Sequence, residues 1–226
     1  MATPAYVPPR AETRASGPTH DASESGERLS RALDICIALL AIAFFAPLML
    51  VVALAVSWSG GPVFFRQSRI GRGGIPFTCL KFRTMHVDGD EMLARLLAEN
   101  PLALSEWERD RKLVCDPRVT AVGAILRKTS LDELPQLFNV LRGSMSIVGP
   151  RPIVDAEVLR YGRYFDAYCR VRPGITGLWQ ISGRSGTSYR RRVACDVTYV
   201  RSKSAYRDVQ IIMKTIPAVC LARGAY

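Results

Sequence analysis

The chain has 226 residues, of which 48% are hydrophobic, and it carries a formal net charge of +11. This length suits one folded domain with an anchoring segment. The positive charge lies after Asp34, where 27 basic residues outnumber 15 acidic ones, and it points to phosphate-bearing partners such as a nucleotide, an anionic lipid or nucleic acid. The six cysteines form no Cys-x-x-Cys pair and have no histidines at metal-binding spacing. This pattern argues against a zinc site and a disulfide framework and suits a reducing cytosol.

The first segment, residues 1–28, is rich in proline, glycine and small residues, so we expect a disordered tail. An apolar run follows, Ala32–Ser57, in which only Asp34 is charged. These 26 residues exceed the roughly 20 that cross a bilayer, so we predict a membrane-inserted helix over residues 29–59. A cleaved signal peptide is the alternative, but its basic start and short apolar core are missing. Pro47 should kink the helix, because it lacks an N–H and clashes with the carbonyl four residues back.

The remaining residues, 60–226, are expected to form one domain of the α+β class, mainly helical with a few short strands. Two strands with a glycine-rich turn between them are predicted from Val63 to Phe82. Helical periodicity indicates four later segments: residues 88–112 with a break at Pro101, 153–168, 188–203 and 208–221.

The stretch over residues 129–152 concentrates the chemistry of the chain. Asp132 and Glu133 are adjacent carboxylates that precede a short helix with one apolar face. The start of this helix can be read in two ways: Ser130 caps it in a Ser-x-x-Glu capping box, or Pro135 takes its first position. Either start puts the carboxylates at a helix N-terminus, where the dipole favours their ionised form. A cap needs only one carboxylate, so a purely structural reading accounts for Glu133 and leaves Asp132 unexplained.

Long motifs recur in a fixed order over most of the chain. They are Lys-Phe-Arg-Thr-Met at 81–85, Asp-Pro-Arg-Val-Thr at 116–120, the 129–152 stretch with its closing Gly-Pro-Arg-Pro, and Arg-Pro-Gly-Ile-Thr-Gly-Leu-Trp-Gln-Ile-Ser-Gly-Arg at 172–184. With these motifs the chain resembles the bacterial sugar transferases, which are monotopic phosphoglycosyl transferases. The likeness extends from about Ser30 to the end and is strongest to the small members that prime exopolysaccharide synthesis.

The resemblance implies a membrane enzyme that moves hexose 1-phosphate from a UDP-sugar, with galactose or glucose as the sugar, to undecaprenyl phosphate, a polyprenyl phosphate. It assigns Asp132 as the nucleophile that carries the phosphosugar covalently while UMP is released. Glu133 would assist with the metal or with a proton transfer. Two adjacent carboxylates repel each other unless a cation lies near them. We therefore expect both to hold Mg²⁺, a hard ion that shares its oxygen ligands with the diphosphate.

Arginine and lysine side chains are expected to bind the substrate phosphates, because the arginine fork gives two parallel charged hydrogen bonds. Arg151 is the strongest candidate, since prolines on both sides stiffen its backbone. Lys81 and Arg83 lie two apart on a predicted strand and should point to the same face. Together with Arg118 and Arg127 they either line a basic cleft or form structural salt bridges.

Other basic residues are weaker candidates. Arg172 and Arg184 flank a glycine-rich loop and are expected to contact the nucleotide or the acceptor phosphate. Three consecutive arginines, residues 190–192, are instead interpreted as a solvated or headgroup-facing patch. Trp179, in the glycine-rich loop, either stacks on a ring or fills the core.

The membrane topology has two readings. Length alone predicts a spanning helix, since 26 residues rise about 39 Å against about 30 Å of hydrocarbon. The resemblance implies a re-entrant helix that bends at Pro47 and returns to the cytosolic side. We expect this second topology, with Asp34 at the level of the lipid headgroups and the catalytic domain on the cytoplasmic face of the bacterial inner membrane.

Two alternatives to this function are considered. A non-enzymatic, membrane-tethered basic module would bind anionic lipid or nucleic acid, and the charge and the anchor suit it. Its basic residues, however, alternate with rigid Gly-Pro turns rather than with aromatic residues placed to stack bases, so we expect no nucleic-acid partner. A polytopic transferase would need further membrane segments, and the sequence has one strong segment. Whether the chain forms a homo-oligomer stays open.

Overall fold

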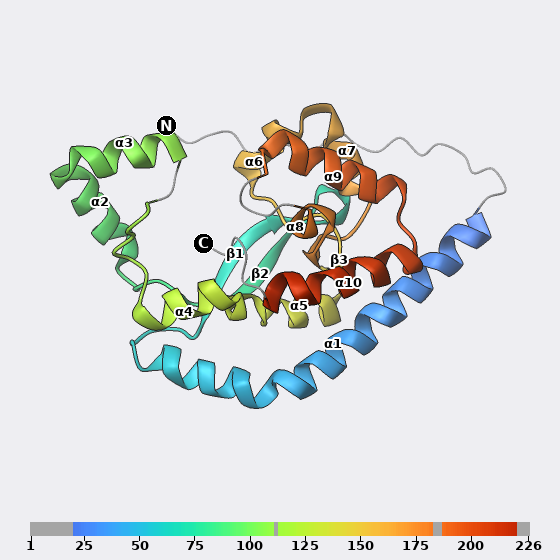
Figure 1. Cartoon of the computed structure of the whole chain (residues 1–226), viewed down its shortest axis with the longest axis horizontal. Helices are drawn as coiled ribbons and strands as arrows, with labels where there is room; N and C mark the ends of the chain where they lie inside the picture. Colours follow the sequence, from blue (N-terminus) through green and yellow to red (C-terminus); the bar gives the residue numbers. More distant parts are fainter. Residues whose placement is uncertain (1–19, 111–112, 183–186, 221–226) are drawn as a thin grey trace.

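The computed structural model describes residues 20–110, 113–182 and 187–220, and its ribbon is mainly helical with a few short strands, so the expected fold class is confirmed (Figure 1). In chain order the elements are α1 (His20–Ser57), β1 (Phe64–Ile70), η1 (Arg72–Gly74), β2 (Pro76–Phe82), α2 (Gly89–Glu99), α3 (Pro101–Asp110), α4 (Ala121–Thr129), η2 (Leu131–Glu133), α5 (Gln136–Arg142), β3 (Ser146–Val148), α6 (Asp155–Tyr161), η3 (Gly162–Tyr164), α7 (Phe165–Cys169), β4 (Gly174–Thr176), α8 (Leu178–Ile181), α9 (Tyr189–Arg201) and α10 (Ala205–Cys220).

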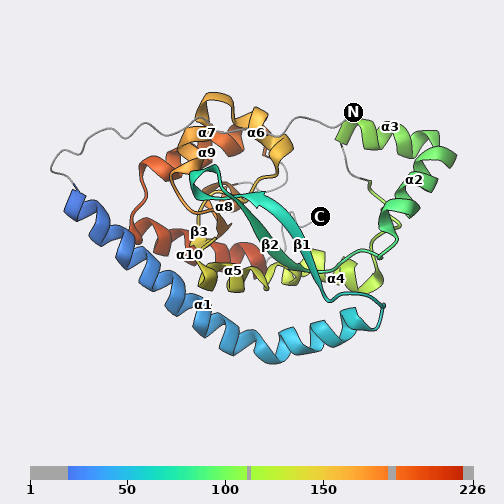
Figure 2. The same ribbon diagram turned by 180° about the vertical axis from the view of Figure 1, so that it is seen from behind.

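Helix α1 begins earlier than the sequence suggested. It starts at His20, so residues 20–28 are helical and the predicted end of the tail at residue 28 is wrong. Contacts with the domain hold this added segment, because the Glu27 carboxylate pairs with the guanidinium groups of Arg72 and Arg172. Pro47 lies inside α1, and the ribbon changes direction near the middle of the helix (Figure 2).

Helix α1 lies along the domain, with one face buried and the other exposed. Ala38 and Val56, near the two ends of its apolar run, are 0% and 2% exposed, whereas Leu40 and Phe44 are 72% and 77% exposed. Among the described residues, Gly26–Ser57 is the one helical segment long and apolar enough to cross a membrane, and its most apolar window has a mean hydropathy of 2.9 and is 17% buried. This low burial distinguishes α1 from the core helix of a soluble protein.

Polar bonds also tie α1 to the domain. The Asp34 carboxylate accepts hydrogen bonds from Ser146 Oγ at 2.9 Å and from the Ile147 N–H at 2.8 Å. Arg31 donates to the carbonyl oxygen of Leu141 at 3.1 Å. Asp34 is 7% exposed and its carboxylate is bonded within the protein, while its expected depth at the level of the lipid headgroups stays a prediction. A buried carboxylate needs such donors, and β3 supplies them.

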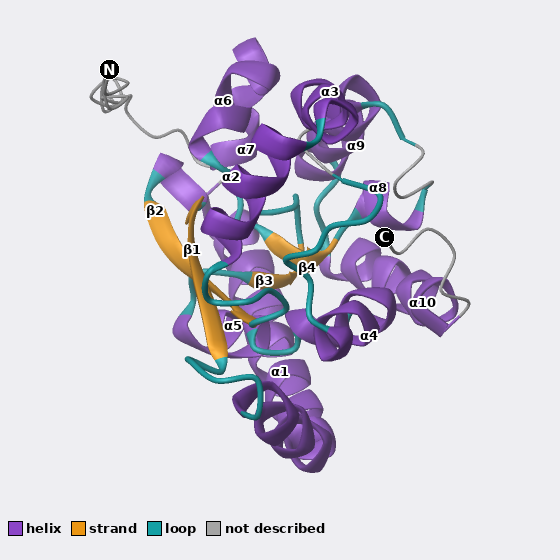
Figure 3. Ribbon diagram, turned by 90° about the vertical axis from the view of Figure 1, so that its left-hand side faces the viewer, coloured by secondary structure: helices purple, strands orange, loops and turns teal. Residues whose placement is uncertain are grey.

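The strands form two small sheets. The two strands and the glycine-rich turn that the sequence predicted are confirmed: β1 and β2 pair in an antiparallel hairpin, with Phe65 opposite Lys81, and η1 makes the turn. β3 and β4 pair in parallel. Viewed from the side, the hairpin lies at one edge of the domain and α1 at its base (Figure 3).

Two helical predictions had different outcomes. The break at Pro101 is confirmed, because α2 ends at Glu99, α3 begins at Pro101, and the side chain of Asn100 accepts from the first N–H groups of α3. The prediction of a single helix over residues 153–168 is wrong. The segment is divided at Gly162, whose φ of 49° lies in the left-handed region that interrupts a helix.

Candidate active site

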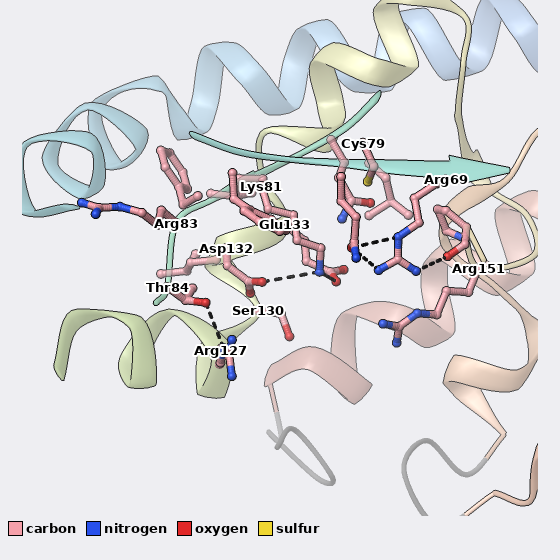
Figure 4. Close-up of a pocket in the computed structure, with 18 of the residues that line it drawn as sticks. Arg69, Cys79, Lys81, Arg83, Thr84, Arg127, Ser130, Asp132, Glu133 and Arg151 are labelled. Carbon is pink, nitrogen blue, oxygen red and sulfur yellow. Dashed lines mark hydrogen bonds and ion pairs between the residues drawn. The ribbon is translucent and has the colours of Figure 1, made fainter. Parts of the chain in front are cut away.

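One cavity of about 940 Å³ contains the carboxylate pair. Its walls come from the β1–β2 hairpin, from the turn at η2 and from segments near α8 and α10. Figure 4 shows Lys81, Asp132 and Glu133 pointing toward one another in it, with Arg127 on one side and Arg151 on the other. The sequence motifs that are far apart along the chain therefore meet at this cavity.

The turn at η2 presents the two carboxylates. Ser130 has a φ of 59° and makes no side-chain capping bond, so the capping-box reading is wrong. Pro135 precedes α5 as its N-cap, which leaves Asp132 and Glu133 just before the helix, close to the second reading. The left-handed Ser130 separates α4 from this turn, and its backbone is strained, since few residues other than glycine, asparagine and aspartate adopt that conformation readily.

Lys81 reaches both carboxylates from β2. Its Nζ lies 2.6 Å from Glu133 Oε1 and 3.5 Å from Asp132 Oδ2. The Asp132 side chain is 12% exposed and that of Glu133 is 32% exposed. A single cation therefore separates two adjacent negative charges.

The two carboxyl groups differ in pKa. Burial raises the pKa of Asp132, and the nearby Lys81 ammonium offsets only part of that rise. Burial also pushes the pKa of Glu133 upward, but Lys81 and Arg151 outweigh it and leave the pKa below its ordinary value. The site therefore shifts the two pKa values in opposite directions from their ordinary values, upward for Asp132 and downward for Glu133. Adjacent carboxyl groups in such unlike surroundings are typical of sites with divided roles.

Two predicted arginines border this pair with donors to spare. Arg127 uses its Nε to bond Thr84 Oγ1 at 2.9 Å. Helix α4 brings it there through a close approach at Gly123, where a Cβ would lie 2.0 Å from the Thr84 carbonyl oxygen. Arg151 is exposed and, within the described part of the chain, makes no hydrogen bond. Both guanidinium groups can still bind an anion in the cavity.

Three predicted ligands are bonded to protein groups, and two of them, Arg83 and Arg118, also border the cavity. Arg83 donates to the carbonyl oxygen of Val56 at 3.1 Å and to Ser59 Oγ at 2.9 Å, and Figure 4 shows it pointing away from Asp132. The strand ends at Phe82, so the alternation that should align Arg83 with Lys81 does not continue.

Arg118 and Arg172 are likewise engaged. Arg118 makes two side-chain bonds to Asp116, at 2.8 and 2.7 Å, and lies over the ring of Trp107. Arg172 donates to the carbonyl oxygen of Gly143 at 3.0 Å, pairs with Glu27 and does not border the cavity, and its expected contact with the nucleotide or the acceptor phosphate stays a prediction. Arg184 lies outside the described residues.

Other cavity residues were not predicted as ligands. Arg69 on β1 donates to Gln67 Oε1 and to the carbonyl oxygen of Pro152 at 2.8 Å, which holds the turn that carries Arg151. The alternation of β1 could have found it, because Phe65, opposite Lys81, and Arg69 share one face.

Arg192 was interpreted as part of a headgroup-facing patch. Its guanidinium instead lies 4.7 Å from the ring centroid of Trp179, donates to the Thr187 carbonyl oxygen, and borders the cavity. Trp179 is 6% exposed, so most of its ring fills the core. A run of three arginines carries no local signal that one of them turns inward.

The structure combines a long, exposed apolar helix with a cavity in which a carboxylate pair lies beside lysine and arginine. The sequence matches the family model described as bacterial sugar transferase over residues 25–222. The exopolysaccharide production protein ExoY of Sinorhizobium fredii is 54% identical over 197 residues, which cover 87% of each chain. The chain belongs to the bacterial sugar transferase family.

Relatives with named reactions are also similar. The undecaprenyl-phosphate galactose phosphotransferase of Salmonella typhimurium is 47% identical over 205 residues, covering 91% of this chain and 43% of that protein. The UDP-glucose:undecaprenyl-phosphate glucose-1-phosphate transferase of Caulobacter vibrioides is 44% identical over 207 residues, covering 87% of this chain and 71% of that protein.

Proposed function

We propose that the protein transfers hexose 1-phosphate from a UDP-sugar to undecaprenyl phosphate, the acceptor that several relatives carry in their names. Galactose and glucose are the sugars of those names, and they differ only in the orientation of one hydroxyl group. The likeness to two ExoY proteins supports a role in exopolysaccharide production, where the lipid-linked sugar would prime assembly.

In the first half-reaction an oxygen of Asp132 attacks the phosphorus atom that carries the hexose. A carboxylate–phosphorus bond forms as the bond from this phosphorus to the bridging oxygen breaks. UMP leaves with that oxygen and its electron pair. The 12% exposure of the Asp132 side chain supports this role, because a site with little water protects a covalent intermediate from hydrolysis.

In the second half-reaction a phosphate oxygen of undecaprenyl phosphate attacks the same phosphorus atom. The bond to Asp132 breaks, the carboxylate is regenerated, and the sugar leaves as an undecaprenyl diphosphate. Lys81, Arg127 and Arg151 would stabilise the charge on the transferred group. The lowered pKa of Glu133 suits it to pair with a cation better than to accept a proton, since a carboxylate of low pKa is a weak base.

Mg²⁺ is the proposed cofactor, and the donors present fit it. Asp132 and Glu133 offer carboxylate oxygens, which hard cations prefer. The described residues place no group of three or more histidine, cysteine, aspartate or glutamate side chains together, so diphosphate oxygens and water would complete the coordination. When bound, the ion would neutralise the diphosphate.

We also propose that α1 is re-entrant and that the catalytic domain lies on the cytoplasmic face of the inner membrane. The packing of α1 supports this topology, because Ala38 and Val56 contact the same domain although they lie on opposite sides of Pro47. A straight spanning helix would separate two such positions by most of the roughly 30 Å hydrocarbon layer.

The observation that carries the reaction is the contact of Lys81 with both carboxylates, in a cavity bordered by Arg127 and Arg151, which have unused hydrogen-bond donors. The test uses the purified protein with radiolabelled UDP-galactose or UDP-glucose, first without and then with undecaprenyl phosphate. We expect UMP and a labelled protein before the acceptor is added, and labelled lipid afterwards.

The Asp132→Asn variant should form neither UMP nor labelled protein, because an amide cannot act as the nucleophile. A labelled Asp132→Asn protein would place the nucleophile elsewhere. Wild-type protein that binds anionic vesicles but releases no UMP would favour the non-enzymatic alternative. EDTA should stop UMP release and added Mg²⁺ should restore it; full activity in the chelator would remove Mg²⁺ from the scheme.

A further inference from the structure

The side chain of Asn139 is buried between α5 and β2. Asn139 is 2% exposed, and its Oδ1 accepts a hydrogen bond from the Leu80 N–H at 2.9 Å. Its Nδ2 donates to the Thr78 carbonyl oxygen at 2.7 Å. One side-chain amide therefore binds β2 through both a donor and an acceptor.

These two bonds lie along the edge of β2 that its partner strand leaves free. The sheet that contains β2 has two strands, β1 and β2. In a strand the N–H and C=O groups of alternate residues point to the same edge, and Thr78 and Leu80 are such a pair. The amide of Asn139 thus bonds to β2 as a peptide group of a third strand would, and it satisfies an edge that is buried under α5.

The position of Asn139 connects it to the carboxylate pair by two short routes. Through β2, Leu80 is followed directly by Lys81, whose Nζ lies 2.6 Å from Glu133 Oε1. Through α5, the chain runs back from Asn139 to Pro135 and then to Glu133. The contact between Lys81 and Glu133 joins the ends of these two routes, so Asn139 is linked to the carboxylate pair through both β2 and α5.

We propose that Asn139 is a positioning residue that fixes β2 against α5 and thereby holds Lys81 beside Asp132 and Glu133. Its effect on turnover rests on the proposed transfer reaction, whereas its effect on Lys81 does not. Asn139 touches no reacting atom; it acts through Lys81.

The side chain can be tested apart from the backbone. The Asn139 carbonyl oxygen accepts from the Ser144 N–H at 3.1 Å and shapes the turn after α5 whatever the side chain is. Asn139→Leu keeps a similar volume and removes both bonds to β2. Asn139→Asp keeps the acceptor for the Leu80 N–H and removes the donor to Thr78.

Three measurements on the purified, membrane-embedded protein test successive steps of the proposal: the bond to β2, the position of Lys81, and turnover. Hydrogen exchange of the Leu80 amide should be roughly tenfold faster in Asn139→Leu, as expected for loss of about one hydrogen bond. Lys81 should react faster with an amine-acylating reagent, measured by mass spectrometry. UMP release per folded molecule should slow, because a displaced Lys81 no longer stabilises the charge on the transferred group. Asn139→Asp should give smaller changes in all three.

Two control variants separate positioning from stability. Ser144→Ala removes a contact to the Asn139 amide at 3.3 Å and leaves both bonds to β2 intact. Tyr161→Phe removes a buried bond between α6 and Asp196 of α9. Neither should change Lys81 reactivity or UMP release per folded molecule, even where thermal stability falls.

Each outcome decides a separate point. Unchanged exchange at Leu80 in Asn139→Leu would show that the amide does not hold β2. Faster exchange with unchanged Lys81 reactivity would overturn the positioning role and leave a structural one. If wild-type protein releases no UMP, the proposed reaction fails, and the Lys81 reactivity still decides the role of Asn139.

Discussion

Two sets of basic residues that look alike in the sequence have different partners in the structure. The first set, Lys81, Arg127 and Arg151, faces the carboxylate pair or the open cavity. The second set, Arg83 and Arg172, binds α1 or the carbonyl groups next to it. Charge and motif therefore do not separate a ligand-binding arginine from one that holds a helix, whereas the partners that each side chain finds in the fold do.

The second set explains how α1 stays on the domain. Arg83 binds the C-terminal end of the helix at Val56, and Arg172 binds its N-terminal part at Glu27. Because both ends are held, substitutions in this set should change stability, and substitutions in the first set should change chemistry.

Removing the Lys81 charge should have the largest effect. Lys81→Met is expected to lower kcat/KM by about 10²–10³-fold, the usual loss when one stabilising group is removed from a charged transition state. Lys81 lowers the pKa values of both Asp132 and Glu133, so its loss raises them. The acidic limb of the pH–rate profile should therefore move to higher pH. An acidic limb that stays at the wild-type pH would show that Lys81 does not influence the ionisation of Asp132 and Glu133.

Replacing the free arginine should affect substrate binding. Arg151→Lys keeps the charge and removes the fork that binds two phosphate oxygens at once. We expect a rise of roughly 10-fold in KM for the UDP-sugar, from the loss of about one charged hydrogen bond, with a smaller change in kcat. Steady-state kinetics measures both, and an unchanged KM would exclude Arg151 from substrate binding.

Replacing the helix-binding arginine should lower stability rather than activity. Arg83→Met removes the guanidinium donor to Ser59 Oγ and to the Val56 carbonyl oxygen, which still accepts from Ser59, and this loss should cost about 1–3 kcal/mol of unfolding free energy. Thermal unfolding in detergent should show the loss, while kcat/KM per folded molecule stays within about twofold. A much larger fall in kcat/KM at full stability would move Arg83 into the first set.

The smallest effect is expected at Glu27. Its pairs with Arg72 and Arg172 are partly exposed, and such pairs contribute about 0.2–1 kcal/mol. Glu27→Gln should lower the unfolding temperature slightly in low salt, and the difference from wild type should shrink as salt screens the pairs. A difference that does not depend on salt would mean that the contact is not electrostatic.

The sequence predicted those parts of the fold that depend on local pattern. Alternation found the β1–β2 hairpin, periodicity found α9 after its Ser188 cap, and Pro101 marked the start of α3. The motif at residues 129–152 located the carboxylate pair, because its residue types and spacing are contiguous.

What the sequence did not predict depends on partners far along the chain. The partners of Arg172 include Glu27, which is 145 residues away, and no local pattern records such a pair. Helix α1 extends back to His20 although its composition suggested disorder, because tertiary contacts outweigh local propensity. The inward turn of Arg192 likewise depends on where α8 places Trp179.

The anchoring of α1 also sets an order in time. Helix α1 leaves the ribosome before any other described element, yet Arg31 bonds to Leu141 and Asp34 to Ser146, at separations of 110 and 112 residues. Such distant contacts close late in folding. Helix α1 therefore keeps an uncovered apolar face until the domain has been synthesised. Early insertion of that face into a membrane would protect the helix from aggregation. Helix α1 is thus synthesised before the other described elements but gains its contacts with the domain late, and the bilayer would cover its apolar face in the interval.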